Sequence, residues 1–225
     1  MSKDVFVFAE QRDGNIQKVA IELIGKAAEL AKALEQRVVA VLLGENVADK
    51  AQSLIDYGAD EVIVVEDKLL GEYITEPYAK ALTAVIRAYE PEIMLYGASA
   101  IGRDLAPRVS ARIHTGLTAD CTGLDIDPDT KNLLMTRPAF GGNIMATIVC
   151  ANHRPQMATV RPGVMKALEK QTRSGKITEF DAGLTSADVN VVIREVVKDT
   201  KKSVDITEAK ILVSGGRGIG ILASV

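Results

Sequence analysis

The residues best suited to chemistry lie in the second half of the sequence, where two arginines stand directly before prolines. Arg137 ends an apolar run, and Arg161 repeats the Arg-Pro pair one predicted hairpin later. A guanidinium in such a place can lie over a planar, electron-rich ring or against its carbonyl oxygens, and it can equally cap nearby backbone carbonyls. The turn after Arg137 contains Gly141, Gly142 and Asn143. This segment is therefore a candidate binding wall whose ligand the residues alone do not identify.

The junction at residues 95–108 is a second candidate. An apolar strand that ends in small residues before a helix is where open α/β sheets bind ligands, and the free amides of the helix start favour anionic groups. Ser99 and Gly102 would let a ligand approach the backbone, and Arg103 would add a positive charge. The alternative is an ordinary tight turn in which Asp104 pairs with Arg103, or with Arg108 one helical turn later.

Two further segments give weaker signals. Residues 114–122 supply hydroxyl groups, among them that of Thr118, but His114 has no recognisable catalytic partner. The segment SGGRGIG at 214–220, which contains Arg217, resembles a phosphate loop, yet its glycines do not fit G-x-G-x-x-G and no Lys-Ser/Thr follows. No Ser–His–Asp, Cys–His or HExxH pattern is present, so the sequence names no residues for hydrolytic or metal chemistry.

The composition excludes several classes of partner. The chain has 225 residues and a net charge of −3, which draws it neither to nucleic acid nor to anionic membranes. Aromatic residues make up 4% and Trp is absent, which argues against a stacking platform for single strands. No apolar run is long enough to span a membrane, and the N-terminus lacks a signal-peptide layout, so we expect a cytoplasmic protein. Cys121 and Cys150 are expected to be small buried hydrophobes.

The elements that must position these residues alternate in the first half of the chain. Apolar runs predict strands at residues 4–10, 37–44, 61–66 and 92–97. Helical spacing of apolar residues predicts helices at 16–34, 47–57, 74–89 and 98–113, the second of which ends at Gly58. Alternating strands and helices of these lengths imply right-handed crossovers and an open parallel sheet.

The pattern changes after residue 114, where short β runs separated by turn signals replace long helices. These runs lie at 118–127, 132–140, 143–150 and 156–161, and they predict an antiparallel extension of the parallel sheet. Residues 166–186 read as a solvated excursion, 189–198 as another strand, and the chain closes with a strand and a Gly-rich turn. The predicted fold class is therefore α/β: an adenine-nucleotide-binding-like parallel sheet with an antiparallel β extension.

Four segments taken in order resemble the electron-transfer flavoprotein α-subunit family over essentially the whole chain. They are GRDLAPR, TGLTADC, TRPAFGGN and MATVRPG, followed by SGGRG. The resemblance is closest to the α subunits of anaerobic, flavin-bifurcating members. It implies an N-terminal α/β domain, residues 1–208, that pairs with a β subunit, and the start of a C-terminal FAD domain at 209–225. Because the sequence stops at Val225, we expect a truncated chain that lacks most of the α subunit's own FAD pocket.

The resemblance also implies a function and a site. It implies an electron carrier, rather than a stand-alone catalyst, that passes electrons through FAD between a donor and an acyl-CoA-dehydrogenase-type partner, as in fatty acid β-oxidation. It places Arg137 near the FAD of the β subunit, beside the turn of Gly141, Gly142 and Asn143. Ser99, Gly102, Arg103 and Thr118 are secondary candidates, together with Arg217.

Two other functions stay open on the sequence. One is a universal-stress-like domain that binds an adenine nucleotide. The other is a scaffold fragment that forms an interface and holds no ligand.

Overall fold

A computed structural model describes residues 3–197, 209, 211–216 and 218. The chain divides into a compact unit, Met1–Val191, and a second unit, Val192–Val225. The fold and the candidate site belong to the first unit, which is described below by itself.

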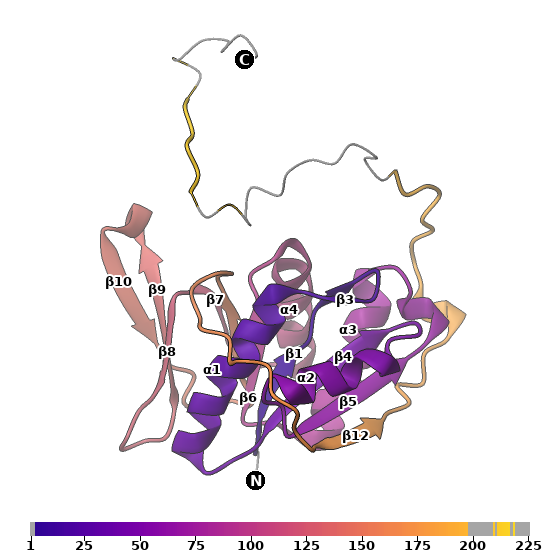
Figure 1. Ribbon diagram of the computed structural model, residues 1–225, viewed down its shortest axis with the longest axis horizontal. Helices are drawn as coiled ribbons and strands as arrows, with labels where there is room; N and C mark the ends of the chain where they lie inside the picture. The colour runs from indigo at the N-terminus through magenta and orange to yellow at the C-terminus, as the bar shows by residue number, and fades with distance from the viewer. Residues whose placement is uncertain (1–2, 198–208, 210, 217, 219–225) are drawn as a thin grey trace. The chain divides into compact units, whose positions relative to one another are not determined.

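The centre of the compact unit is a seven-stranded sheet in which every strand pair is parallel (Figure 1). The strands are β1 (Val5–Phe8), β4 (Val38–Gly44), β5 (Glu61–Glu66), β6 (Ile93–Gly97), β7 (Leu117–Cys121), β11 (Gln156–Val160) and β12 (Lys176–Glu179). Their spatial order is β12-β5-β4-β1-β6-β11-β7. The chain proceeds outward from β1 in one direction through β4 and β5, and then returns to β6 on the other side. The switch point of the fold, where α/β sheets bind ligands, therefore lies between β1 and β6.

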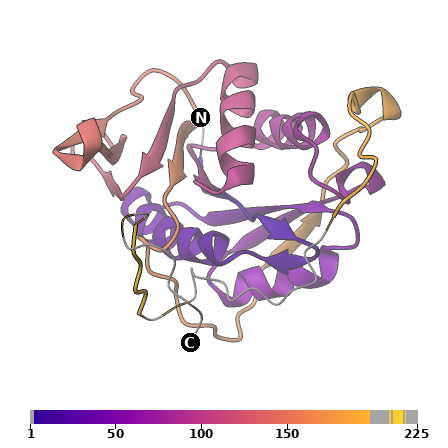
Figure 2. The same ribbon diagram turned by 90° about the horizontal axis from the view of Figure 1, so that it is seen from above.

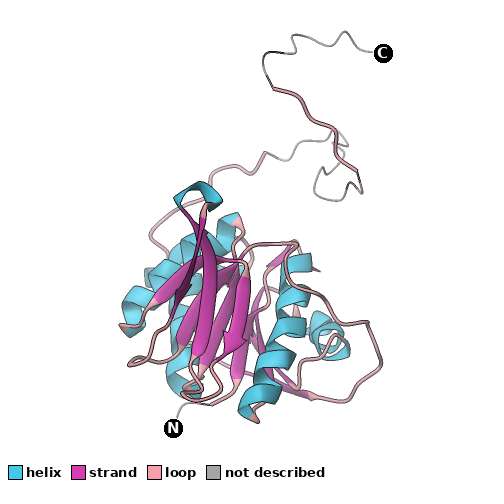
Figure 3. Cartoon of the chain, turned by 90° about the vertical axis from the view of Figure 1, so that its left-hand side faces the viewer, coloured by secondary structure: helices cyan, strands magenta, loops and turns pink. Residues whose placement is uncertain are grey.

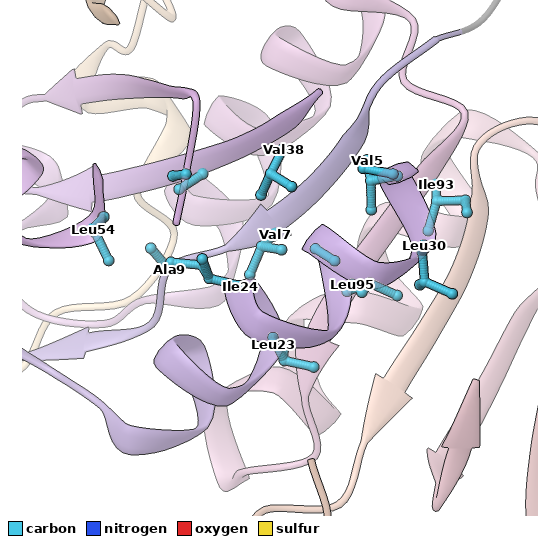
Figure 4. Close-up of a cluster of buried hydrophobic side chains, with 14 of the residues drawn as sticks. Val5, Val7, Ala9, Leu23, Ile24, Leu30, Val38, Leu54, Ile93 and Leu95 are labelled. Carbon is cyan, nitrogen blue, oxygen red and sulfur yellow. The ribbon is translucent and has the colours of Figure 1, made fainter. Parts of the chain in front are cut away.

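Two pairs of helices cover opposite faces of this sheet (Figure 2). They are α1 (Lys18–Leu34) with α2 (Ala51–Asp56), and α3 (Thr75–Tyr89) with α4 (Ala100–Ile113). The alternation of β1 assigns its side chains: Val5 and Val7 pack under α1, while Phe6 and Phe8 belong to the cluster under α3 and α4. Figure 4 shows the first cluster, with Ile24 of α1 close to Val7 and Ala9. Burial on both faces explains why these strands are continuous apolar runs.

A second, three-stranded antiparallel sheet stands beside β7. It consists of β8 (Gly123–Ile126), β9 (Leu133–Ala139) and β10 (Ile144–Ile148), and a 3-10 turn, η3 (Phe140–Gly142), joins β9 to β10 (Figure 3). A short hairpin of β2 (Gln11–Arg12) and β3 (Asn15–Ile16) follows β1. The remaining 3-10 turns are η1 (Ala48–Lys50), η2 (Lys68–Leu70) and η4 (Ser186–Asp188).

The α/β class and the antiparallel extension are confirmed, but the extension is smaller than predicted. The run at 118–127 divides: its first part joins the parallel sheet as β7, and only its second part enters the antiparallel sheet as β8. The run at 156–161 becomes β11, a parallel strand inserted between β6 and β7. All five residues of β11 are buried, because the strand lies inside the parallel sheet. The turn signals on either side of it do not indicate this central position.

In the last part of the chain, two predicted strands are not formed in their described residues and one short strand was not predicted. Residues 166–186 are mostly exposed, as expected of a solvated excursion. Within the expected excursion at 166–186, β12 pairs with β5, held by bonds from Lys176 Nζ (2.9 Å) and Thr178 Oγ1 (2.7 Å) to the Glu61 carboxylate. The expected strand at 189–198 is not formed in its described part, residues 189–197. Val192 and Val197 are each 82% exposed there, so the β-branched residues lack a neighbouring strand within the described chain. Residues 211–216 likewise form no strand.

Candidate functional site

The N-terminus of α4 is built around Ser99 and Gly102. Ser99 is the N-cap, and its Oγ accepts a hydrogen bond from the Gly102 amide at 3.0 Å. Gly102 is required because a Cβ there would lie 1.9 Å from the carbonyl oxygen of Gly97, at the end of β6. This contact packs the first turn of α4 directly onto the strand end at the switch point.

Glu10, which follows β1, contacts the N-terminus of α4 from the neighbouring strand. Its side chain is 1% exposed and accepts a hydrogen bond from the Ser99 hydroxyl. Arg12 binds the other carboxylate oxygen through Nη2 (2.8 Å) and Nε (3.1 Å). A buried carboxylate therefore lies at the cap of α4, where related folds hold a phosphate. Its negative charge opposes binding of a second anion at this point.

A second acidic residue, Asp120 of β7, forms ion pairs with arginines from other elements. Arg161, just after β11, donates to both carboxylate oxygens, from Nε at 3.2 Å and from Nη2 at 2.7 Å. Arg103 of α4 lies 3.6 Å from the same group. The hydrogen bonds from Arg161 lower the pKa of Asp120 more than its partial burial raises it, and the charges of Arg103 and Arg137 also lower it. Two guanidinium groups, those of Arg161 and Arg103, lie within 3.6 Å of this carboxylate, and the charge of a third, Arg137, acts on it without an ion pair in the described chain.

The backbone at Asp120 has a special geometry. Its φ is +61°, in the left-handed region, and the pairing of β7 with β11 shifts register between Ala158 and Val160. The Asp120 amide donates to the Thr159 hydroxyl at 2.9 Å instead of a regular strand partner. The bulge directs this carboxylate toward the arginines.

The hairpin of β9, η3 and β10 presents the remaining candidate residues to the surface. Arg137 of β9 lies opposite Ala146 of β10. Within the described residues its guanidinium makes neither a hydrogen bond nor an ion pair, although its charge lowers the pKa values of Asp120 and Cys121. Gly141 and Gly142 have φ values of +69° and +92°, and the space above each is open to 4 Å. Asn143 is exposed beside them.

The same hairpin is unusually apolar for an exposed element. Phe140 at its tip is 82% exposed, and Ile144 and Met145 on β10 are each more than half exposed. Ile144 and Met145 are consecutive in β10, so their side chains point to opposite faces of the hairpin. Exposed apolar side chains gathered on one element are typical of interaction surfaces. The hairpin therefore combines an unpaired cation, an open glycine turn and an apolar surface.

The structure divides the residues expected from the sequence into groups. Ser99 and Gly102 lie at the closed switch point, whereas Arg103 and Arg137 join the Asp120 cluster. Thr118 is 5% exposed and belongs to the interior of β7. Arg217 lies outside the described residues.

The surface-pair alternatives for α4 were wrong. Asp104 accepts hydrogen bonds from Tyr73 and Thr75, each at 2.6 Å, instead of binding a neighbouring arginine. Arg108 lies 3.5 Å from Glu76. His114 is the C-cap of α4, with a φ of +56°.

The two cysteines differ. Cys121 is buried, as expected, and burial raises the pKa of its thiol to about 11, which keeps it protonated at neutral pH. Cys150 is only partly buried.

Sequence reasoning missed three residues: Glu10, Asp120 and Phe140. Glu10 and Asp120 lie at or just after strand ends, which is a recognisable signal for residues at the ligand-binding edge of a parallel sheet. The exposure of Phe140 could not be read from an apolar run.

Two absences hold for the described part of the chain. Its His, Cys, Asp and Glu side chains form no group of three or more that could hold a metal ion. None of its helices has the length and apolar character needed to cross a membrane.

Comparison with known proteins places this fold in a family. A profile of the electron transfer flavoprotein domain matches residues 5–185. The electron transfer flavoprotein subunit alpha of Thermoanaerobacterium thermosaccharolyticum is 55% identical over 97% of this chain and 66% of its own length. Protein FixB of Clostridium saccharobutylicum is 49% identical over 97% and 65% of the respective lengths.

A third relative is subunit LctC of the lactate dehydrogenase (NAD(+),ferredoxin) of Acetobacterium woodii, which is 43% identical over 96% of this chain and 52% of its own length. The chain thus spans just under two thirds of the length of the curated relatives named first, at 66% and 65%. On the match of residues 5–185 and these identities, the chain belongs to the electron transfer flavoprotein family.

Proposed function

We propose that this chain acts as an α-type subunit of an electron transfer flavoprotein and forms one wall of a FAD site held mainly by a β subunit. The observation that supports this best is the β9–β10 hairpin, where the unpaired Arg137 stands beside an exposed apolar tip. The full proposal includes a cytoplasmic electron carrier that serves an acyl-CoA-dehydrogenase-type partner, with electron bifurcation as in the flavin-bifurcating members of the family that the sequence resembles.

The residues on the hairpin fit a flavin as a wall. A guanidinium with all its donors available suits the carbonyl oxygens of a planar ring. Gly141 and Gly142 leave their backbone open, so a flat group can approach without meeting a side chain. When bound, FAD supplies the electron-transfer chemistry, and the protein supplies position, charge and exclusion of water.

Each residue has a distinct part in this proposal. Arg137 provides positive charge, which favours the negative charge that a neighbouring ring gains on reduction. Phe140 at the tip and Ile144, which shares the Arg137 face of the hairpin, become buried against the partner and exclude water from the ring edge. Ser99 and Gly102 hold the N-terminus of α4 against the end of β6 and are secondary candidates for contact with the ligand, together with Arg103 and Thr118.

The domain boundary remains part of the proposal. Residues 1–208 would form the partner-binding domain, and residues 209–225, with Arg217, would begin a second flavin domain. The support is the resemblance of SGGRG to the start of that domain.

The test is redox titration of the flavin in a complex of this chain with a β subunit. Arg137→Ala should lower the midpoint potential of the shared flavin by about 59 mV, a tenfold change for a one-electron step. Arg108→Ala, which removes an exposed arginine bound to Glu76, is the matched control and should leave the potential unchanged. An unaltered titration for Arg137→Ala would refute the flavin wall. A colourless complex that still assembles would favour the scaffold function instead.

Nucleotide binding by the compact unit finds little support. Glu10 places a negative charge at the switch point, at the cap where a phosphate would bind.

A further inference from the structure

Asp120 is the centre of a charge cluster drawn from four separate elements. The carboxylate comes from β7, and the arginines come from α4, from β9 and from the residue after β11. The formal charge of the four groups is +2. Because the two bound arginines are 46% and 62% exposed, this charge faces solvent and is not sealed in the core.

The backbone around Asp120 is shaped to hold its carboxylate in this place. The left-handed φ, the bond to Thr159 and the register shift are all departures from regular strand pairing, and they coincide at one residue. A non-glycine residue at positive φ is uncommon and carries a conformational cost. A surface ion pair alone needs no such local distortion, since any exposed carboxylate can meet an arginine.

We propose that Asp120 is a positioning residue for the shared flavin site: it fixes Arg161 and Arg103 beside Arg137 and sets the positive charge that the three present to the ring. The inference rests on the proposed function, because it assumes that Arg137 faces a flavin of the partner. It adds two arginines and one carboxylate to a site so far described by Arg137 alone.

The charge argument gives opposite signs for two substitutions. Arg137→Ala removes a positive charge, so electron uptake by the ring becomes less favourable. Asp120→Asn removes a negative charge, so electron uptake becomes more favourable. Asn tolerates positive φ well, so this variant keeps the local backbone. Asp120→Glu keeps the charge and serves as the conservative variant.

The experiment is redox titration of the complex with a β subunit, carried out on these three variants and on Asp125→Asn. Asp125 lies on β8 with a side chain 73% exposed, 3.9 Å from Lys26, and is the matched control carboxylate. We expect Asp120→Asn to raise the equilibrium constant for one-electron reduction of the flavin by about threefold or more. A change of this size is measurable, since a tenfold change corresponds to about 59 mV. Asp120→Glu should stay near the wild type, and Asp125→Asn should show no shift.

A readout on the chain alone tests the positioning itself. In the wild type the Arg161 Nε–H should give a resolved NMR signal that exchanges slowly, because it donates to Asp120. Asp120→Asn should speed that exchange by about tenfold, whereas Asp125→Asn should not change it. Unchanged Arg161 exchange in Asp120→Asn would overturn the positioning role.

The outcomes separate this inference from the proposed function. If Arg137→Ala shifts the potential and Asp120→Asn does not, the role of Asp120 is overturned while the flavin wall stands. If Arg137→Ala has no effect, the flavin wall itself fails and this inference fails with it. Potential shifts of opposite sign in Arg137→Ala and Asp120→Asn, with an unchanged potential in Asp125→Asn, support both the flavin wall and the role of Asp120.

Discussion

Glu10 and Asp120 both lie at the carboxyl edge of the parallel sheet, and both bind arginine, but their surroundings differ. The Glu10 side chain is 1% exposed and its partners, Ser99 and Arg12, close around it. The Asp120 side chain is 27% exposed and lies among more positive charges than it can neutralise. One acid completes a closed structure, whereas the other leaves a charged surface facing outward.

The difference suggests that the region around Glu10 serves the stability of the fold, whereas the region around Asp120 and the hairpin is suited to binding. At the switch point, helix cap, glycine contact and carboxylate satisfy one another, so that region contributes to folding. At the hairpin, Arg137 makes no ion pair and Phe140 is 82% exposed within the described chain, so these residues contribute little to folding. Substitutions at the two places should therefore act on different measurements.

The largest expected loss of stability is at the closed region, for Gly102→Ala. The added Cβ would meet the Gly97 carbonyl oxygen at 1.9 Å, which the backbone can relieve only by moving α4 away from β6. We expect a loss of about 3 kcal/mol in the free energy of unfolding, measured by urea denaturation. Gly141→Ala is the control: it meets open space and is strained only by its φ of +69°, so it should cost about 1 kcal/mol. Equal losses for the two variants would show that α4 is not packed as described.

Glu10→Ala should come next. It removes the acceptor of the Ser99 hydroxyl and of Arg12 from a buried position, which should cost about 2 kcal/mol. Glu29→Ala, which removes an exposed carboxylate bound to Lys26, should change stability by less than about 0.5 kcal/mol. The comparison between the regions would break down if Glu10→Ala were as mild as Glu29→Ala.

A smaller effect is expected from the pH dependence of Asp120. Its pKa is lowered in the folded chain, so its contribution to stability is fully present above the unfolded pKa of about 3.9 and is lost as the pH falls through the folded value. Asp120→Asn lacks this contribution. The stability difference between wild type and variant should therefore shrink on acidification from about pH 6 to below pH 4. A difference that grew in acid would contradict the lowered pKa.

The smallest effect on folding is expected for Phe140→Ser. The ring is 82% exposed, so its removal should change the free energy of unfolding by less than about 0.5 kcal/mol. Binding to a β subunit should weaken by about tenfold or more, as for an aromatic residue at the centre of an interface. Calorimetric titration measures the second quantity. Val164→Ser, at another exposed apolar residue outside the hairpin, is the control and should not affect binding.

Sequence patterns predicted well the elements whose burial is periodic. The strand at 37–44 and the helix at 74–89 agree with β4 and α3 to within one residue at each end, because core packing sets both pattern and structure. Gly58 ends its helix at a φ of +118°, as its residue type indicated. The patterns failed where strand pairing is decided between residues far apart in the sequence. An example is β11, which lies between β6 and β7 in the sheet although it follows both in the chain.

The candidate site was predicted in part. Arg137 and its glycine turn lie together on an exposed hairpin, as their Arg-Pro and Gly-Gly signals suggested. The patterns did not predict that Ser99 would be bound by Glu10, since the two residues are 89 positions apart. The patterns also did not predict that Thr118 would be 5% exposed, because alternation along β7 points its side chain inward.

The insertion of β11 between β6 and β7 has a consequence for synthesis of the protein. A chain that emerges from the ribosome has made β6 and β7 well before Gln156–Val160. Until β11 arrives, β6 is paired only with β1, and β7 has no partner in the parallel sheet. The edge at β5 waits longer still, for Lys176–Glu179. Nascent chains shorter than about 160 residues would therefore expose unpaired parallel edges, and such species are prone to aggregation. The parallel sheet is therefore completed only when the late strands β11 and β12 have been synthesised, and the first half of the chain cannot complete it alone.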